Sequence, residues 1–195
     1  MIRFVTTLTI ALTLAAPAHA EDSDNGGKES ESYWELAFAG GMLMPLSGMT
    51  EEHQQSLAGN VRFGWVSSLG LGLDLAIDYS PLSRRQLDPE EVYEVHFATA
   101  GLLPRFTLGK HILRLWLAAG GGMTYEQIAH ISTRGIAGLE PTVRRFSAAG
   151  MGAAGLELHA FSGVGLAVTG SYTHTYGEVA YQLVNVTGGL AVTFQ

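Results

Sequence analysis

The chain has 195 residues, of which 47% are hydrophobic and 15% are charged, and its formal net charge is −7. This length suits one domain with a substantial core. The acidic balance does not favour nucleic acid as a partner, and the lack of Cys excludes disulfides and thiolate metal sites.

The first segment, 1–20, has the pattern of a secretory signal peptide. Arg3 precedes an apolar stretch from Phe4 to Ala16, and Ala18-His19-Ala20 forms a small-x-small cleavage site. Residues 21–32 are acidic and polar, so they have little to bury and are expected to form a flexible tail. After this point no segment offers the ~18 uncharged apolar residues that a membrane-spanning helix needs.

From residue 33 onward the hydrophobic pattern repeats every second residue, which is the period of a β-strand. The first three expected strands are 33–44, 59–67 and 71–79. In the third of these, large apolar residues occupy one face and Asp74 and Asp78 lie on the other. A helix would scatter the two Asp residues into the apolar face, so a strand is the better interpretation.

The fourth expected strand places Val95 and Phe97 on its apolar face, opposite Glu94 and His96. The alternation then fails at Leu102-Leu103-Pro104. Because Pro has no N–H to donate to a neighbouring strand, we expect a β-bulge or bend at this point.

Four more strands complete the pattern, and their expected ranges are 111–125, 143–160, 164–176 and 183–195. The connections alternate in length. Long ones are expected at 45–58, 80–91 and 127–142, and short ones at 68–70, 109–110 and 161–163. This alternation is typical of bacterial membrane barrels.

The last strand also separates an apolar face from a small or polar face. One parity holds Val184, Val186, Leu190, Val192 and Phe194, and the other holds Asn185, Thr187, Gly189, Ala191 and Thr193. A terminal amphipathic strand that closes on an aromatic residue resembles the C-terminal signature of bacterial outer-membrane β-barrels, although Gln195 follows Phe194 here. Because of this last strand and the layout of the other strands, residues 33–195 resemble the small eight-stranded barrels of the OmpA/OmpX type.

The resemblance implies an all-β fold, an eight-stranded antiparallel up-and-down transmembrane β-barrel with short periplasmic turns and longer external loops. It implies residence in the bacterial outer membrane with both termini in the periplasm, so that 21–32 is a periplasmic tail. Phe194 would then be the assembly signal that the barrel-assembly machinery reads. Pairing of the first strand with the last would satisfy the backbone hydrogen bonds in lipid.

In a membrane barrel the polar parity faces the lumen and the apolar parity faces lipid. The predicted polar network of the lumen is Glu35, Arg62, Asp74, Asp78, Glu94, His96, Arg114, Glu126, Glu157 and His159. The interior of an eight-stranded barrel is only just wide enough for side chains. Buried charges must therefore pair, and we expect Arg62 and Arg114 to pair with the lumen glutamates. Such a network is either a rigid polar core or a path for ions.

Aromatic residues near the strand ends are expected to form girdles at the membrane interfaces. They are Trp34, Tyr79, Tyr93, Tyr125, Tyr172, Tyr176 and Tyr181. Outer-membrane lipid is thus a predicted partner.

The sequence predicts a non-enzymatic envelope protein with a structural or surface-interaction role, whose surface ligand it does not identify. A narrow passive pore and a lipid-modifying enzyme are the alternatives. Residues 171–175 place hydroxyl groups near His174 but lack the His-x-Ser-Asn signature of the deacylase barrels. His53, His130 and His174 lie far apart in the layout. No catalytic residue, metal site or cofactor is predicted.

Overall fold

All of the predicted strands are present, and most of them extend beyond the expected range. The computed structural model describes residues 32–46, 55–83, 91–109, 112–132, 143–161, 163–177 and 180–195. Its strands are β1 Tyr33–Pro45, β2 Ser56–Val66, β3 Leu71–Ser83, β4 Glu91–Leu108, β5 Leu113–Ser132, β6 Val143–Phe161, β7 Val164–Tyr176 and β8 Gln182–Phe194. The expected signal peptide, the tail up to residue 31 and most of the long connections lie outside the described residues.

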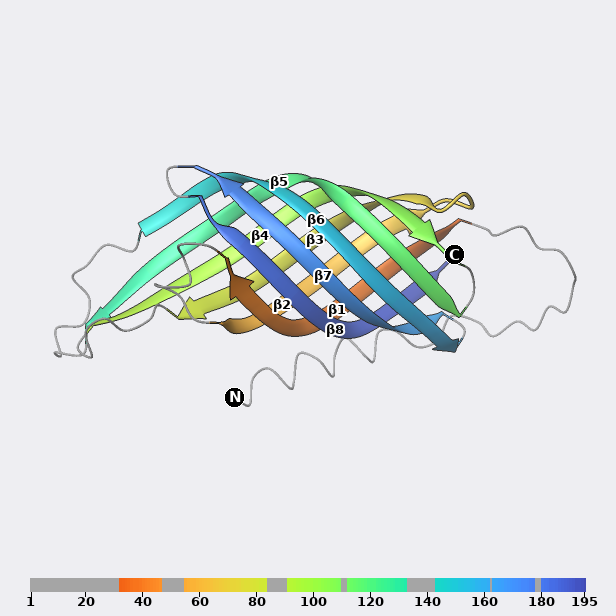
Figure 1. Cartoon of the computed structure of the whole chain (residues 1–195), viewed down its shortest axis with the longest axis horizontal. Helices are drawn as coiled ribbons and strands as arrows, with labels where there is room; N and C mark the ends of the chain where they lie inside the picture. Colours follow the sequence, from red (N-terminus) through yellow and green to blue (C-terminus); the bar gives the residue numbers. More distant parts are fainter. Residues whose placement is uncertain are drawn as a thin grey trace, which may run out of the picture.

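The eight strands form a closed antiparallel barrel (Figure 1), in which each strand pairs with the next and β1 pairs with β8. At the closure, Trp34 pairs with Trp65 of β2 on one side and with Phe194 of β8 on the other. Each strand therefore has two hydrogen-bonded neighbours, as a sheet that spans lipid requires. The predicted fold class is confirmed. Among the described residues, no helix is long and apolar enough to cross a membrane.

Short connections, which we call the tight turns, join β2 to β3, β4 to β5 and β6 to β7. A Gly with positive φ lies in or beside each, namely Gly70 at 80°, Gly109 at 92° and Gly163 at 78°. Gly adopts this conformation readily because it has no Cβ. Since the strands alternate in direction, these turns lie at the same end as the start of β1 and the end of β8. We call this the turn end, and the opposite end, where the long connections lie, the loop end.

A belt of large apolar side chains covers the outside of the barrel. In β3, Leu73, Leu75 and Ile77 point outward and are 41–48% exposed, whereas Asp74 and Ala76 between them are buried. Soluble proteins rarely expose a continuous apolar surface of this size. The apolar parity therefore faces lipid and the polar parity faces the lumen, as the sequence predicts for every strand except β4.

In β4 the predicted orientation is wrong near the loop end. Val95 and Phe97 face the lumen and are almost fully buried, whereas His96 faces outward. Inside, the two apolar residues pack against Leu43 and Leu183. In this part of β4 apolar side chains face the lumen and His96 faces outward, so the usual relation between polarity and direction is reversed.

The sequence predicts a bulge or bend at Leu102–Pro104, and the bulge is not found. The pairing of β4 with β3 keeps one register through these residues. The pairing with β5 is interrupted at Leu103 and Pro104 and resumes in the register that it had before. Pro104 is tolerated here because the pairing with β5 is interrupted at this residue, so the missing N–H is not needed there. A register shift does occur between Leu158 and Phe161, next to the turn from β6 to β7.

The fold makes a simple spectroscopic prediction. Detergent-solubilised protein should give a β-type circular dichroism spectrum, because its described secondary structure consists of strands. It should also migrate faster on a gel when unheated than when boiled, because a closed barrel resists the detergent. A helical spectrum, or solubility without detergent, would contradict the transmembrane barrel.

Candidate functional site: the barrel lumen

Five charged side chains meet inside the barrel, nearer the turn end than the loop end. They are Glu35 of β1, Arg62 of β2, Asp74 of β3, Arg105 of β4 and Glu157 of β6, and none is more than 4% exposed. We name this group the ionic cluster. Each member lies on the inward parity of its strand, and barrel closure brings the five strands around one point. Burial of charges at such a point is tolerated only when they are paired with good geometry.

Two guanidinium groups share the carboxylates of the ionic cluster. Arg62 Nη2 donates hydrogen bonds to Glu35 Oε1 at 2.6 Å and to Glu157 Oε1 at 2.7 Å. Arg105 donates to the same two oxygens, through Nη1 at 2.7 Å and through Nη2 at 3.1 Å. Asp74 Oδ2 lies further away, 3.5 Å from Arg62 Nε and 3.7 Å from Arg105 Nη1. These charge-assisted bonds join four strands through one network.

The ring of Trp116 on β5 covers both arginines. The Cζ atom of Arg62 lies 3.8 Å from the ring centroid and that of Arg105 lies 4.9 Å from it. Both distances fall within the range of cation–π attraction. The ring has room because its register partner on β6 is Gly155, and a Cβ at that position would overlap the ring. Trp116 and Gly155 thus form a matched large and small pair.

A second group of polar residues extends the network toward the turn end. His159 Nε2 lies 3.3 Å from Glu157 Oε2 and 3.4 Å from Arg114 Nη1. The guanidinium carbon of Arg114 lies 4.4 Å from the ring centroid of Tyr33. Arg114 is the register partner of Glu157, yet its guanidinium lies against His159 and Tyr33. Arg114 is therefore connected to the ionic cluster indirectly, through the imidazole of His159.

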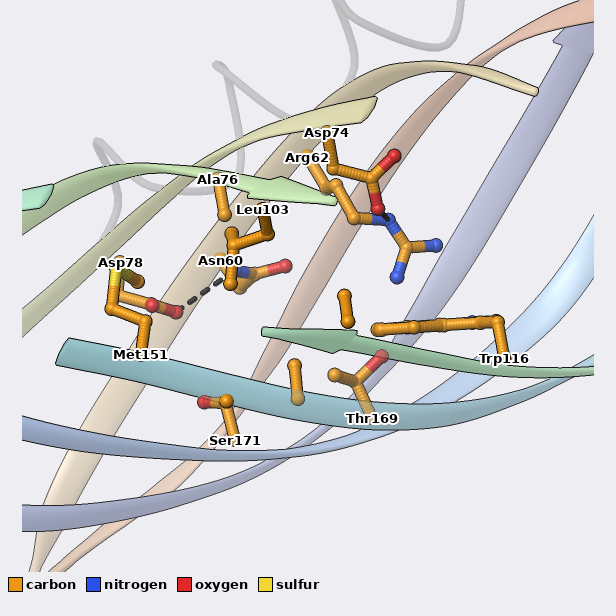
Figure 2. Close-up of a pocket in the computed structure, with 13 residues that line it drawn as sticks. Asn60, Arg62, Asp74, Ala76, Asp78, Leu103, Trp116, Met151, Thr169 and Ser171 are labelled. Carbon is orange, nitrogen blue, oxygen red and sulfur yellow. Dashed lines mark hydrogen bonds and ion pairs between the residues drawn. The ribbon is translucent and has the colours of Figure 1, made fainter. Parts of the chain in front are cut away.

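On the loop side of the ionic cluster there is a small cavity of about 20 Å³ (Figure 2). Arg62, Asp74 and Trp116 form part of its lining. Asn60 also lines it, and its Nδ2 donates a hydrogen bond of 2.8 Å to Asp78 Oδ1. A cavity of this volume has room for about one water molecule. It is not the continuous aqueous space of a wide porin.

Nearer the loop end an apolar plug fills the lumen. Its buried members are Leu43, Ala58, Val95, Phe97 and Leu183, with Ile128 and Tyr181 packed against them. The rings of Phe97 and Tyr181 meet edge-on with centroids 5.0 Å apart, and the Tyr181 hydroxyl donates to Glu126 Oε1 at 2.6 Å. Tyr181 therefore belongs to the lumen and not to the interfacial girdle in which the sequence analysis places it.

The structure places most of the predicted polar network inside the barrel. The inward residues are Glu35, Arg62, Asp74, Asp78, Arg114, Glu126, Glu157 and His159. They do not form a single network: Asp78 and Glu126 lie apart from the ionic cluster, bonded to Asn60 and Tyr181. His96 requires a correction, because it faces outward and its Nδ1 lies 2.9 Å from the Tyr79 hydroxyl. The side chain of Glu94 lies outside the described part of the chain.

Arg105 is the central residue that the sequence analysis misses. The sequence analysis ends the alternation at Leu102-Leu103-Pro104, directly before Arg105. Continued without interruption from Val95, the alternation leads directly to an inward Arg105, as the register shows. Arg105 pairs with Glu35 and Glu157, two of the lumen glutamates that the sequence analysis pairs with Arg62 and Arg114.

Neither the histidines nor the hydroxyl-rich strand β7 assembles a recognisable reaction centre in the described residues. No group of three or more His, Cys, Asp or Glu that could hold a metal is found among them. On β7, Thr173 and Thr175 are buried in the lumen, whereas His174 lies on the outward parity against Tyr176. The hydroxyls and the imidazole therefore lie on opposite faces of the sheet, where they cannot form a nucleophile and base pair.

No protein-family model matches the chain, and no curated protein matches it. Solved structures do resemble it. Neisserial surface protein A matches with a TM-score of 0.58 and 12% identity, covering 83% of this chain and 97% of that one. Ail, the attachment invasion locus protein of Yersinia pestis, in complex with the heparin analogue sucrose octasulfate, matches with a TM-score of 0.53 and 12% identity, covering 86% of this chain and all of that one (100%).

These structural matches establish the fold. Their sequence identity of 12% is too low to indicate the role of this chain. The matches cover most of this chain and nearly all of the matched chains, and the structure described above is a closed barrel of eight strands. The chain therefore has the fold of the small eight-stranded outer-membrane β-barrels.

Proposed function

We propose that this chain is a non-enzymatic protein of the bacterial outer membrane that acts through its outer surface and external loops, as a structural or surface-contact component of the envelope. Its termini and tight turns would lie in the periplasm, and its lipid-facing belt would contact outer-membrane lipid. The observation that carries the proposal is the filled lumen. The ionic cluster with Trp116 and the apolar plug block the interior at two levels.

Blockage at two levels argues against the pore alternative. Passage of an ion would require the cluster to separate, which leaves buried charges without partners at a cost of several kcal/mol, roughly. The apolar plug adds a second barrier, because Phe97 and Leu183 offer nothing to replace the hydration of an ion. A role of the outer surface does not require the ionic cluster or the apolar plug to move.

The proposal predicts the absence of steady conductance in a planar bilayer. Purified, refolded barrel should show no open state of long duration, whereas a matched preparation of a known porin provides the positive control. A variant in which Phe97 is replaced by Ala should leave this result unchanged, because the ionic cluster still closes the lumen. Stable ohmic conductance of the wild type would favour the passive pore instead.

The alternative of a lipid-modifying enzyme is tested by analysis of lipid A. Expression of the protein in a Gram-negative host should leave the mass spectrum of lipid A unaltered. A mass change that corresponds to loss or gain of an acyl chain would overturn the non-enzymatic proposal.

Phe194 provides a prediction about assembly. It faces outward, is 39% exposed and pairs with Trp34 at the barrel closure. Removal of Phe194 and Gln195 should strongly reduce insertion into the outer membrane and leave unfolded protein in the periplasm. Removal of Gln195 alone is the control and should be tolerated. Equal recovery of the double deletion and the wild type in the outer-membrane fraction would show that Phe194 is not the assembly signal.

A further inference from the structure

Three polar side chains lie side by side on the outer face of the barrel, near the loop ends of β4, β5 and β6. His96 and Gln127 are register partners in the β4–β5 pair, and Gln127 and Arg144 are register partners in the β5–β6 pair. Residues directly opposite each other on neighbouring strands have Cβ atoms about 4.5–5.5 Å apart. The three side chains therefore form a continuous row, which we name the donor row.

An aromatic row lies two residues further toward the turn end on the same face. Tyr125 and Phe146 are register partners with ring centroids 5.0 Å apart, and Ala98 links Tyr125 to Tyr79 by register. Outward-facing aromatic residues collect where the hydrocarbon of a membrane meets its headgroups. Two residues of a strand span about 6–7 Å. The donor row therefore lies at the level of the headgroups.

Hydrogen bonds from the aromatic row orient the donor row. The Tyr79 hydroxyl lies 2.9 Å from His96 Nδ1, and the two rings stack. The Tyr125 hydroxyl donates to Gln127 Oε1 at 3.2 Å, which uses the acceptor of that side chain and not its NH2 group. Arg144 is exposed at the end of the row, and a guanidinium has N–H donors and no acceptor. The row thus presents donors and one fixed positive charge.

The outward surface on the turn side of the aromatic row is apolar. Met123, which is 59% exposed, has Ala100 and Ala148 as register partners, and in the next outward row Leu102 and Gly150 flank Gly121. We name this surface the apolar strip. Headgroup donors, aromatic rings and the apolar strip follow one another in the order of the headgroup and the acyl chain of a lipid.

We propose that the donor row binds the phosphate group of a phosphorylated glycolipid in the membrane leaflet at the loop end. Arg144 supplies the charge, and Gln127 supplies a neighbouring hydrogen bond of the kind that phosphate oxygens accept. The sugar ring would lie on the aromatic row and an acyl chain on the apolar strip. The assignment to the outer leaflet rests on the proposed outer-membrane orientation, whereas the binding itself does not.

The test uses the full-length barrel in neutral phosphatidylcholine nanodiscs and counts bound lipid by native mass spectrometry. The probes are a bisphosphorylated diglucosamine glycolipid and its dephosphorylated counterpart. Arg144→Gln should weaken binding of the phosphorylated probe roughly five- to tenfold, as loss of one cation near an anionic surface predicts. Binding of the dephosphorylated probe should not change. Arg144→Lys should retain most of the affinity.

A matched control is Arg145→Gln, because that neighbour has the opposite parity and is the register partner of the lumen residue Glu126. It should leave lipid binding near the wild-type value. Equal affinity of the Arg144→Gln variant and the wild type would overturn the proposal, and so would equal weakening of both probes. Displacement of the glycolipid by an equal concentration of inorganic phosphate would show a site for a free anion instead. None of these outcomes depends on the conductance or lipid A results, so the two proposals fail separately.

Discussion

Replacement of Arg105 by Met is expected to destabilise the folded barrel by about 3–5 kcal/mol. Arg105 Nη1 and Nη2 bond to the buried carboxylates of Glu35 and Glu157. The neutral side chain would leave three carboxylates facing Arg62 alone. The measurement is the free energy of unfolding in urea, with the protein in phospholipid vesicles and folding followed by gel mobility.

Two controls separate the loss of pairing from the loss of an Arg. Arg144→Met removes an exposed guanidinium and should change the unfolding free energy by no more than about 0.5 kcal/mol. The double variant Arg105→Met with Glu35→Leu should be more stable than the sum of the two single changes predicts, because it removes both members of a pair. Strictly additive effects would mean that the two side chains do not interact as the structure indicates.

Gly155→Ala is expected to destabilise the barrel by about 1–3 kcal/mol, although alanine adds a single methyl group. The new Cβ would overlap the Trp116 ring. The ring cannot move aside without losing its contacts with Arg62 and Arg105. Unfolding in urea again provides the measurement, and Trp116→Phe should restore part of the stability of the Gly155→Ala variant.

The matched control for this substitution lies three residues away on the same strand. Gly152 faces outward, and a Cβ built there meets nothing within 4 Å. Gly152→Ala should therefore be nearly neutral. If the two alanine variants were equally stable, the close fit of Trp116 against β6 would be wrong.

The strand layout follows from the sequence because the two faces of a lipid-spanning strand meet opposite environments. In β3, the alternation of Leu73, Leu75 and Ile77 with Asp74 and Ala76 defines both the strand and its direction. The tight turns are marked by Gly residues that the backbone requires, as at Gly70 and Gly109. These are local features, so one sequence is enough to find them.

The orientation of β4 could not be found in the same way. The rule that apolar residues face lipid holds only where the outer face lies in hydrocarbon. Near the loop end of β4, Val95 and Phe97 face the lumen and His96 faces outward. The apparent failure of alternation at Leu102–Pro104 marks this change of environment along a strand of constant register, and not a bulge.

The partners within the lumen depend on barrel closure, which no local pattern determines. Arg105 and Glu35 are far apart in the sequence, and they meet because β1 and β4 contribute to one layer of the interior. Arg114 has the parity and the register partner that favour pairing with Glu157. Its guanidinium instead contacts His159 and Tyr33, since the arginines of β2 and β4 already occupy the carboxylates.

The central claim is that the apolar parity faces lipid and the polar parity faces a filled lumen. The three tryptophans test it directly, because Trp34 and Trp65 are 43% and 40% exposed on the outside whereas Trp116 is 2% exposed inside. The measurement is quenching of tryptophan fluorescence by brominated acyl chains in vesicles. The fluorescence of the Trp116→Phe variant, which retains Trp34 and Trp65, should be strongly quenched. The fluorescence of the double variant Trp34→Phe with Trp65→Phe, which retains Trp116, should be nearly unaffected. Strong quenching of Trp116 would contradict the account, because it would place the polar parity against lipid.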